Sequence, residues 1–197
     1  VTTTIADDDS APTVTLAVDQ ATIAESAGEA KFTATLSNAS TQAVTVDLGF
    51  TGTANLTDDY TRTGTQVVIA AGSLSGFVTV TAVPDTVFEG DETIVVDIWG
   101  VTNGTESGTQ TATATIRDDD SAPTVTLAVD QATIAENAGV AKFTATLSNA
   151  STQAVTVDLG FTGTATLTAD YTRTGTQIVI AAGSLSGFVT VTAVPDT

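Results

Sequence analysis

Short runs in which apolar residues alternate with polar or small ones recur along the chain and indicate β-strands. Val14, Leu16 and Val18 form one such run, and Ile94, Val96 and Ile98 form another. A period of two places every second side chain on one face, which can pack on a core. Gly, Asn, Ser and Asp residues separate the runs, as expected of turns. Within residues 10–120 the pattern predicts seven strands, at residues 13–18, 30–37, 43–50, 65–70, 77–83, 92–99 and 109–116.

Seven short strands in about 110 residues predict immunoglobulin-like antiparallel β-sandwich domains in tandem, in an all-β chain. No window of comparable length shows a helical period, and the abundance of Val, Ile and Thr favours strands. The core is expected to hold the aromatic side chains of Phe32, Phe50, Phe77 and Phe88.

An internal repeat organises the chain. Residues 10–86 align without a gap with residues 121–197, at an offset of 111 (121 − 10), and differ at five positions. Residues 3–9 also match residues 114–120 at the isoleucine and at three aspartates. The sequence therefore predicts residues 1–9 as the last strand of a preceding repeat and residues 10–120 as a complete domain. Residues 121–197 are predicted to form an incomplete domain that lacks its last two strands, and both ends are interpreted as cut from a longer array.

The incomplete domain raises the question of what covers its open edge. An unpaired sheet edge accepts another strand. Residues 1–5 have the sequence of a final strand, so a second copy of the chain could supply them and self-associate by strand addition. The alternative is that further residues of a longer protein complete the domain.

The charge and the missing residue types exclude several classes of function. The chain has 23 acidic and five basic residues, a net charge of −18, which repels nucleic acid and anionic lipid. Without Cys or His it cannot form disulfides, structural zinc sites or histidine-based catalytic sites. No apolar run approaches about 18 residues, so membrane insertion is not expected. No nucleophile motif or phosphate-binding loop is present, and the chain is predicted not to be an enzyme.

Carboxylates gather at three places in the complete repeat. Asp85, Glu89, Asp91 and Glu92 lie between the fifth and sixth predicted strands, Asp118–Asp120 follow the last strand, and Glu25 lies in the turn after the first. Alternate loops of a sandwich lie at the same end, so these acids are expected to meet at one pole. Such a cluster is unfavourable without a cation, whereas Ca²⁺ takes about 6–8 oxygen ligands. The pattern predicts bound Ca²⁺. The alternative is a set of solvated acidic loops.

The same residues resemble the Calx-β family of sodium–calcium exchangers and integrin β4. The matching pieces are Ile23-Ala24-Glu25 with Gly28, Gly52-Thr53-Ala54 with Asp58-Asp59-Tyr60, Ala71-Gly72, the run from Asp85 to Glu92, and Asp118-Asp119-Asp120. The resemblance implies these calcium ligands: Glu25, Asp85, Glu89, Glu92, Asp118, Asp119 and Asp120. Thr51 stands where calcium-binding members often carry Asp, which implies fewer ions or weaker binding. Asp59 is interpreted as a turn cap and not as a ligand.

These observations predict a calcium-rigidified spacer, or an adhesin or fibre segment, secreted or at a bacterial cell surface. Its expected partners are calcium ions and neighbouring repeats of the same protein. Near-identical repeats favour a spacer, because recognition domains usually diverge. One alternative is a calcium-sensing pair of regulatory domains. Another is a carbohydrate- or protein-binding module, for which an exposed aromatic platform is the usual signal. Trp99 is the only tryptophan in the chain.

Overall fold

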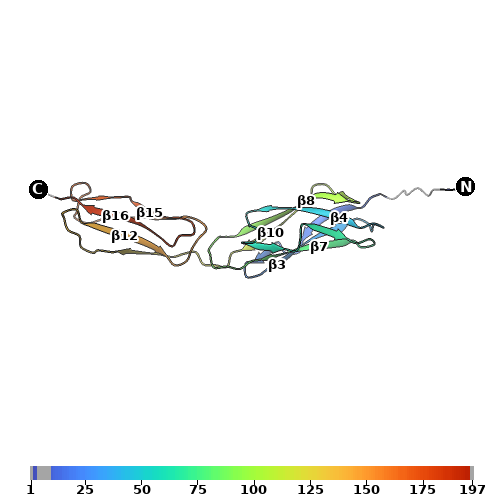
Figure 1. The fold of residues 1–197 in the computed structure, drawn as a ribbon, viewed down its shortest axis with the longest axis horizontal. Coiled ribbons are helices and arrows are strands. Elements are labelled where there is room, and N and C mark those ends of the chain that lie inside the picture. Colours follow the sequence, from blue (N-terminus) through green and yellow to red (C-terminus); the bar gives the residue numbers. More distant parts are fainter. Residues whose placement is uncertain (1, 4–9, 196–197) are drawn as a thin grey trace. The chain divides into compact units, whose positions relative to one another are not determined.

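The computed structural model describes residues 2–3 and 10–195, and its regular elements are all β-strands (Figure 1). The chain forms two compact units. The first comprises the residues up to Asp85 together with Gly90–Asp119, and the second comprises Thr86–Glu89 together with the residues from Asp120 on. Over the described residues, no helix has the length and apolar character needed to cross a membrane.

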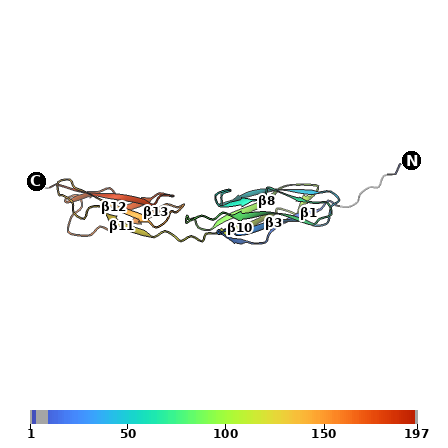
Figure 2. The same cartoon turned by 60° about the horizontal axis from the view of Figure 1, so that its bottom comes forward.

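Two five-stranded sheets pack face to face in the first unit. One has the strand order β5-β7-β3-β1-β9 and the other the order β2-β10-β8-β4-β6. Figures 1 and 2 both label β3 of the first sheet and β8 and β10 of the second. The strands are β1 (Thr13–Val18), β2 (Thr22–Ala24), β3 (Glu29–Leu36), β4 (Val44–Gly52), β5 (Tyr60–Arg62), β6 (Gln66–Ile69), β7 (Ser75–Ala82), β8 (Glu92–Thr102), β9 (Thr105–Glu106) and β10 (Thr111–Arg117). The predicted sandwich class is confirmed.

The seven predicted strands correspond to β1, β3, β4, β6, β7, β8 and β10, with each end within about three residues of its prediction. The structure adds the two- and three-residue strands β2, β5 and β9. β2 pairs in parallel with β10, and β9 pairs in parallel with β1. Runs this short carry no alternation, so their pairing with longer strands is what makes them strands.

Apolar side chains from both sheets fill the space between them. Phe32 is fully buried, and Ile94 and Val96 of β8 are buried with it. Phe50 packs at the edge of this core. The prediction for Phe77 is wrong, because its side chain is 56% exposed.

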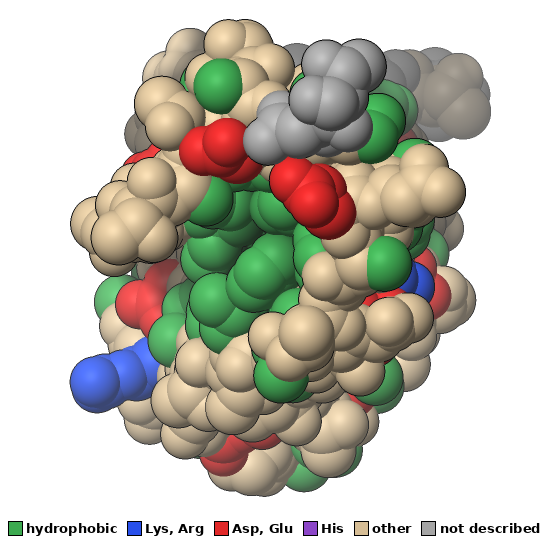
Figure 3. All heavy atoms as spheres, turned by 90° about the vertical axis from the view of Figure 1, so that its left-hand side faces the viewer, with side chains coloured by type: hydrophobic (Ala, Val, Ile, Leu, Met, Phe, Trp, Pro, Cys, Tyr) green, Lys and Arg blue, Asp and Glu red, His purple; other side chains and the backbone are tan. Residues whose placement is uncertain are grey.

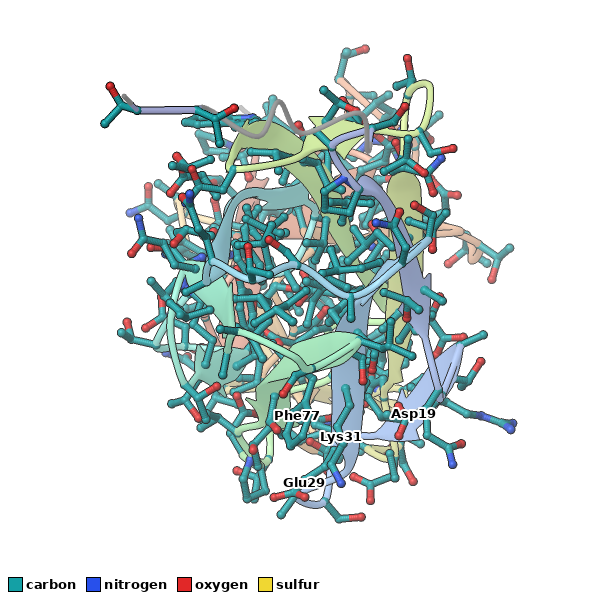
Figure 4. The ribbon with its side chains drawn as sticks, turned by 90° about the vertical axis from the view of Figure 1, so that its right-hand side faces the viewer. Asp19, Glu29, Lys31 and Phe77 are labelled. Atoms are coloured by element: carbon teal, nitrogen blue, oxygen red, sulfur yellow. The ribbon has the colours of Figure 1, made fainter. Side chains whose placement is uncertain are left out.

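The exposure of Phe77 follows from the alternation in β7, where Val78 and Val80 point inward. Phe77 therefore points outward, and the ammonium of Lys31 lies over its ring at 5.3 Å from the centroid. Figure 4 shows the side chains of Phe77 and Lys31 on the outer face of the sheet, in the same region as Asp19 and Glu29. A lysine stem over an exposed ring covers part of its apolar surface while the charge stays in water.

The described residues of the second unit form six strands in a four-stranded sheet, β11-β12-β16-β14, and a two-stranded sheet, β13-β15. The strands are β11 (Val125–Val129), β12 (Val140–Leu147), β13 (Val155–Asp158), β14 (Tyr171–Arg173), β15 (Gln177–Ile180) and β16 (Ser186–Ala193). The counterpart of β4 is thus shortened to β13. Residues 133–135, which correspond to β2, form no strand. β2 pairs with β10, and the described part of the second unit contains no strand equivalent to β10.

Identical residues therefore differ in burial between the units. Val14 and Leu16 are 0% and 7% exposed, whereas their counterparts Val125 and Leu127 are 42% and 54% exposed. In the first unit β1 contacts β10 and β8, and the described residues of the second unit offer no equivalent contacts.

The second unit also has an apolar hollow on its surface. Its volume is about 300 Å³, and its lining includes Phe143, Phe161, Tyr171 and Val191. Figure 3 shows apolar side chains in the floor of a hollow with acidic side chains at its rim. Addition of residues 1–5 from a second copy stays a prediction, since residues 1, 4 and 5 lie outside the described residues.

Candidate metal centre

Glu25 directly follows β2, and the parallel pairing of β2 with β10 fixes its place. Ala24 is the register partner of Arg117, and the Glu25 N–H donates to the Arg117 carbonyl at 3.1 Å. The next turn closes tightly, with Ala27 at φ +66° and the Gly28 N–H donating to the Ala24 carbonyl at 2.8 Å. The short strand thus brings the Glu25 carboxylate to the end of β10, where only 5% of the residue is exposed.

The surroundings of Glu25 combine burial with other acidic groups. Burial raises the pKa of its carboxyl group above the usual 4.5, and the negative charges of Asp118 and Asp85 raise it further. Backbone hydrogen bonds from Asp85 and Asp119 act in the opposite direction. The Asp85 N–H donates to Oε1 of Glu25 at 3.4 Å. The charged form of Glu25 is therefore disfavoured, and a cation would relieve this.

The described residues contain two groups of three carboxylates that could each hold a metal ion. Within each group, one carboxylate oxygen from every member lies within 4.8 Å of the others. The first group is Glu25, Asp85 and Asp120, and the second is Asp59, Glu89 and Glu92. Asp120 directly follows Asp119 and Glu89 directly precedes Gly90, so each is covalently adjacent to the first unit. Five of the seven predicted ligands fall in these groups.

Asp118 and Asp119, the other two predicted ligands, lie outside both groups. Oδ2 of Asp118 accepts the Gly90 N–H at 2.5 Å, which ties the end of β10 to the loop before β8. Asp119 offers its backbone N–H to Glu25. Both residues therefore help to shape the centre, and their role as direct ligands stays a prediction.

Asp59 is the member of the second group that the sequence analysis left out. Its residue is 7% exposed, and Oδ2 accepts the Asn55 N–H at 2.5 Å, so the predicted turn cap is present. The cap also directs the carboxylate toward Glu89 and Glu92. A signal was available in the repeat, since Asp59 is kept as Asp170 while the neighbouring aspartate is replaced by Ala169. Capping and ligation are compatible because a carboxylate has two oxygens.

The second repeat lacks the surroundings that bury Glu25. Its counterpart Glu136 has the same preceding residues, Ile134 and Ala135, yet is exposed. Among the described residues no strand equivalent to β10 lies beside it. The local sequence alone therefore does not form the centre.

We expect Gly28→Ala to disturb the centre by moving the turn that follows Glu25. A Cβ at residue 28 would lie 2.6 Å from the Ala24 backbone nitrogen and 2.9 Å from the Ile23 Cβ. The backbone must shift, at a cost of about 1–3 kcal/mol in the free energy of unfolding of the first unit. Gly64→Ala is the matched control, because a Cβ there meets no atom closer than 4.0 Å. Urea unfolding compares the two variants. Equal urea midpoints for Gly28→Ala and Gly64→Ala would contradict the expected clash.

The donor set of both groups consists of carboxylate oxygens, which suit hard cations such as Ca²⁺ and Mg²⁺. The chain contains no Cys or His, the ligands that zinc and copper prefer. Three carboxylates in a group also leave room for backbone carbonyls and water, which complete the coordination of Ca²⁺. The residues present therefore fit Ca²⁺.

Comparison with known proteins gives one family and several similar folds. The sequence model described as Calx-beta domain matches residues 7–120 and residues 118–197. CBD12 from CALX1.2 is 18% identical over 92% of this chain and 76% of that chain, with a TM-score of 0.48. The apo-form Calx CBD1 domain is 21% identical over 55% of this chain and 99% of that chain, with a TM-score of 0.45. The calcium binding domain CBD12 of CALX1.1 is 16% identical over 92% and 76%, with a TM-score of 0.45. Among curated proteins, none matches the chain.

Proposed function

The chain belongs to the Calx-beta domain family, and on this premise we propose that its complete repeat binds Ca²⁺. The observation that carries the proposal is the burial of Glu25 with the carboxylates of Asp85 and Asp120 close to it. Three acidic groups in such proximity repel one another, and a divalent cation converts this repulsion into attraction. The bound ion supplies positive charge.

The residues that would hold calcium are the two carboxylate groups. Glu25, Asp85 and Asp120 would provide one set of oxygens, and Asp59, Glu89 and Glu92 the other. Asp118 and Asp119 would support them from the end of β10. With few carboxylates in each group, we expect an affinity typical of extracellular modules, for which dissociation constants are about 10⁻⁴–10⁻³ M.

We further propose that calcium stiffens a row of such repeats, which serves as an extracellular spacer or fibre segment. Asp118–Asp120 lead directly into Ser121-Ala122-Pro123, so an ion held there restrains the first residues of the connection. The proline restricts the residue before it as well. The near identity of residues 10–86 and 121–197 supports a spacer, whose units need length and stiffness but no separate recognition surfaces.

A calcium titration of the whole chain tests the proposal. After removal of divalent ions, we expect calorimetry to show saturable binding of Ca²⁺ and a thermal midpoint for the first unit that rises with Ca²⁺ concentration. At about one hundred times the dissociation constant the stabilisation is about 2.7 kcal/mol. Mg²⁺ should give a smaller shift, because it retains its water and takes fewer protein ligands. Absence of binding at millimolar Ca²⁺ would overturn the proposal.

A pair of charge-matched variants locates the binding. Asp85→Asn removes one charge from the first carboxylate group, and Asp19→Asn removes one charge outside both groups. Oδ1 of Asp19 accepts the Lys31 N–H at 2.7 Å, a bond that asparagine can keep (Figure 4). We expect Asp85→Asn to weaken Ca²⁺ binding and Asp19→Asn to leave it unchanged. Equal losses would mean that only the net charge of the chain matters.

The spacer and the sensor differ in affinity and in response. A spacer has a weak site, and Ca²⁺ narrows the spread of molecular dimensions in small-angle scattering. A sensor binds Ca²⁺ below micromolar concentration and changes shape. Submicromolar binding with a shape change would therefore replace the spacer by the regulatory alternative.

A further inference from the structure

Trp99 has a large apolar side chain that is exposed to solvent. It is 76% exposed, although Ile94, Val96 and Ile98 of the same strand are buried. A β-bulge accounts for its position. On β4 the register partner of Asp47 is Gly100 and that of Leu48 is Ile98, so Trp99 is the extra residue of β8. Bulges re-aim side chains and are enriched beside functional sites.

The indole of Trp99 is packed against β4. A Cβ built at Gly49 would collide with Nε1 of Trp99 and would lie 2.7 Å from its Cε2. The absence of a side chain at Gly49 therefore lets the ring lie against the strand, while most of its surface remains open to solvent. An exposed aromatic ring held in this way is a preorganised stacking surface.

A hollow of about 520 Å³ lies beside the ring, at the point where β6 begins. Its lining includes the polar side chains of Asp47, Gln66 and Arg62. Gln66 Nε2 donates to Oδ1 of Asp47 at 2.5 Å, and the Arg62 guanidinium lies 4.3 Å from the centroid of the Phe50 ring. Each polar group is therefore held by a partner and needs little ordering when a ligand binds.

We propose that this hollow binds a neutral saccharide, with one pyranose ring stacked on Trp99. The C–H face of a pyranose is apolar and packs on an indole, as other amphipathic partners of tryptophan do. Its hydroxyl groups match the planar carboxylate, amide and guanidinium groups, which offer acceptors and donors in pairs.

The charges around the hollow select among ligands. Asp47 and Asp97, together with a net charge of −18, repel sialylated, uronic or sulfated glycans. A Cβ built at Gly49 would meet the Asp97 carboxylate as well as the Trp99 indole, so both side chains lie on the same side of Gly49. The guanidinium of Arg62 in the lining offsets part of the acidic charge and so reduces the attraction for a lysine-rich peptide. A ligand without net charge satisfies both restrictions.

The second unit supplies an internal control. Gln177 Nε2 donates to Asp158 Oδ1 at 2.6 Å, and the Arg173 guanidinium lies 4.5 Å from the centroid of the Phe161 ring. The polar side chains of the hollow are thus repeated, but the chain has no second tryptophan. One saccharide site per chain follows, in the first unit.

The test begins with an array of neutral, sialylated and sulfated glycans probed with the whole chain. Neutral oligosaccharides that bind are then titrated against the fluorescence of Trp99, the sole tryptophan, with and without Ca²⁺. We expect a saturable change at millimolar ligand in both conditions, which keeps this result independent of calcium binding. The proposal is overturned if no neutral glycan binds at millimolar concentration, or if only anionic glycans or cationic peptides bind.

Variants of the hollow identify the binding residues by calorimetry, which needs no tryptophan. Trp99→Ala should weaken saccharide binding at least about tenfold, equivalent to about 1.4 kcal/mol. Trp99→Phe should keep part of the affinity, and Asp47→Asn should reduce it. The matched control Asp158→Asn, in the second unit, should change nothing. Trp99 is exposed, so its variants should keep the wild-type circular dichroism, and saccharide binding that survives Trp99→Ala in a folded chain would overturn the proposal.

Discussion

Phe32→Ala is expected to lower the free energy of unfolding of the first unit by about 3–5 kcal/mol. Phe32 is fully buried and is among the largest completely buried side chains of this unit. Its removal loses the transfer free energy of a phenyl ring and leaves a cavity between the two sheets. The fluorescence of Trp99, which lies in the first unit, measures the effect during urea unfolding.

Phe143→Ala is the matched substitution, because Phe143 occupies the equivalent position in the second repeat. Phe143 is half-buried and packs edge-on against Phe161, with 6.5 Å between ring centroids. With less apolar surface removed from water, its loss should cost about 1–2 kcal/mol and be visible by circular dichroism. The urea midpoint followed by Trp99 fluorescence, which reports on the first unit, should not change. Equal costs for the two substitutions would contradict the difference in packing between the units.

Glu25→Gln is expected to have opposite effects with and without Ca²⁺. Without Ca²⁺ at neutral pH the variant should be at least as stable as the parent chain, because the glutamine removes a buried charge that faces Asp85 and Asp118. With Ca²⁺ it should be less stable than the parent, since a ligand is lost. An affinity reduced at least about tenfold removes about 1.4 kcal/mol of the calcium-dependent stabilisation. Thermal unfolding at fixed Ca²⁺ measures both effects, and an undiminished calcium shift would contradict the role of Glu25.

The pH dependence of the calcium-free chain follows from the raised pKa of Glu25. The folded state holds the proton more tightly than the unfolded state, whose carboxyl has its usual pKa of 4.5. The contribution of Glu25 to stability is therefore fully present below this value and is lost as pH rises through the raised pKa. Ca²⁺ binds the deprotonated carboxylate, so the affinity of the chain for Ca²⁺ should decrease as the pH is lowered through the same range. Glu25→Gln should remove this part of both pH profiles.

The strand pattern was predictable where a strand has one buried and one exposed face. The alternation located β1, β3, β7 and β8, and it also explains why Phe77 points outward, one position before the inward Val78. β2 could not be predicted, because three residues carry no period and the strand exists through its pairing with β10. This matters for the site, since β2 is what places Glu25.

The acidic site was predictable in its general location and less so in its grouping. The sequence indicated that Glu25, Asp85 and Asp120 would share one pole, and the structure brings their carboxylates together. Asp119 differs from Asp120 because successive side chains of an extended segment point to opposite sides. Asp118 differs because its carboxylate accepts the Gly90 N–H. Glu25 and Glu136 follow the same Ile-Ala pair and yet differ in burial. Their difference arises from tertiary neighbours, which no local pattern contains.

The β8–β10 pair completes the sandwich formed by the other strands of the first unit. Nearly the same sequence as those other strands is present a second time in each molecule, since residues 10–86 and 121–197 differ at only five positions. During refolding, the pair can close on its own repeat or on the open face of another molecule. The first event is intramolecular and does not depend on concentration, whereas the second is bimolecular. We therefore expect protein concentration to set the balance between monomers and domain-swapped oligomers. Dilution favours the monomer, and crowded repeats of nearly identical sequence favour exchange.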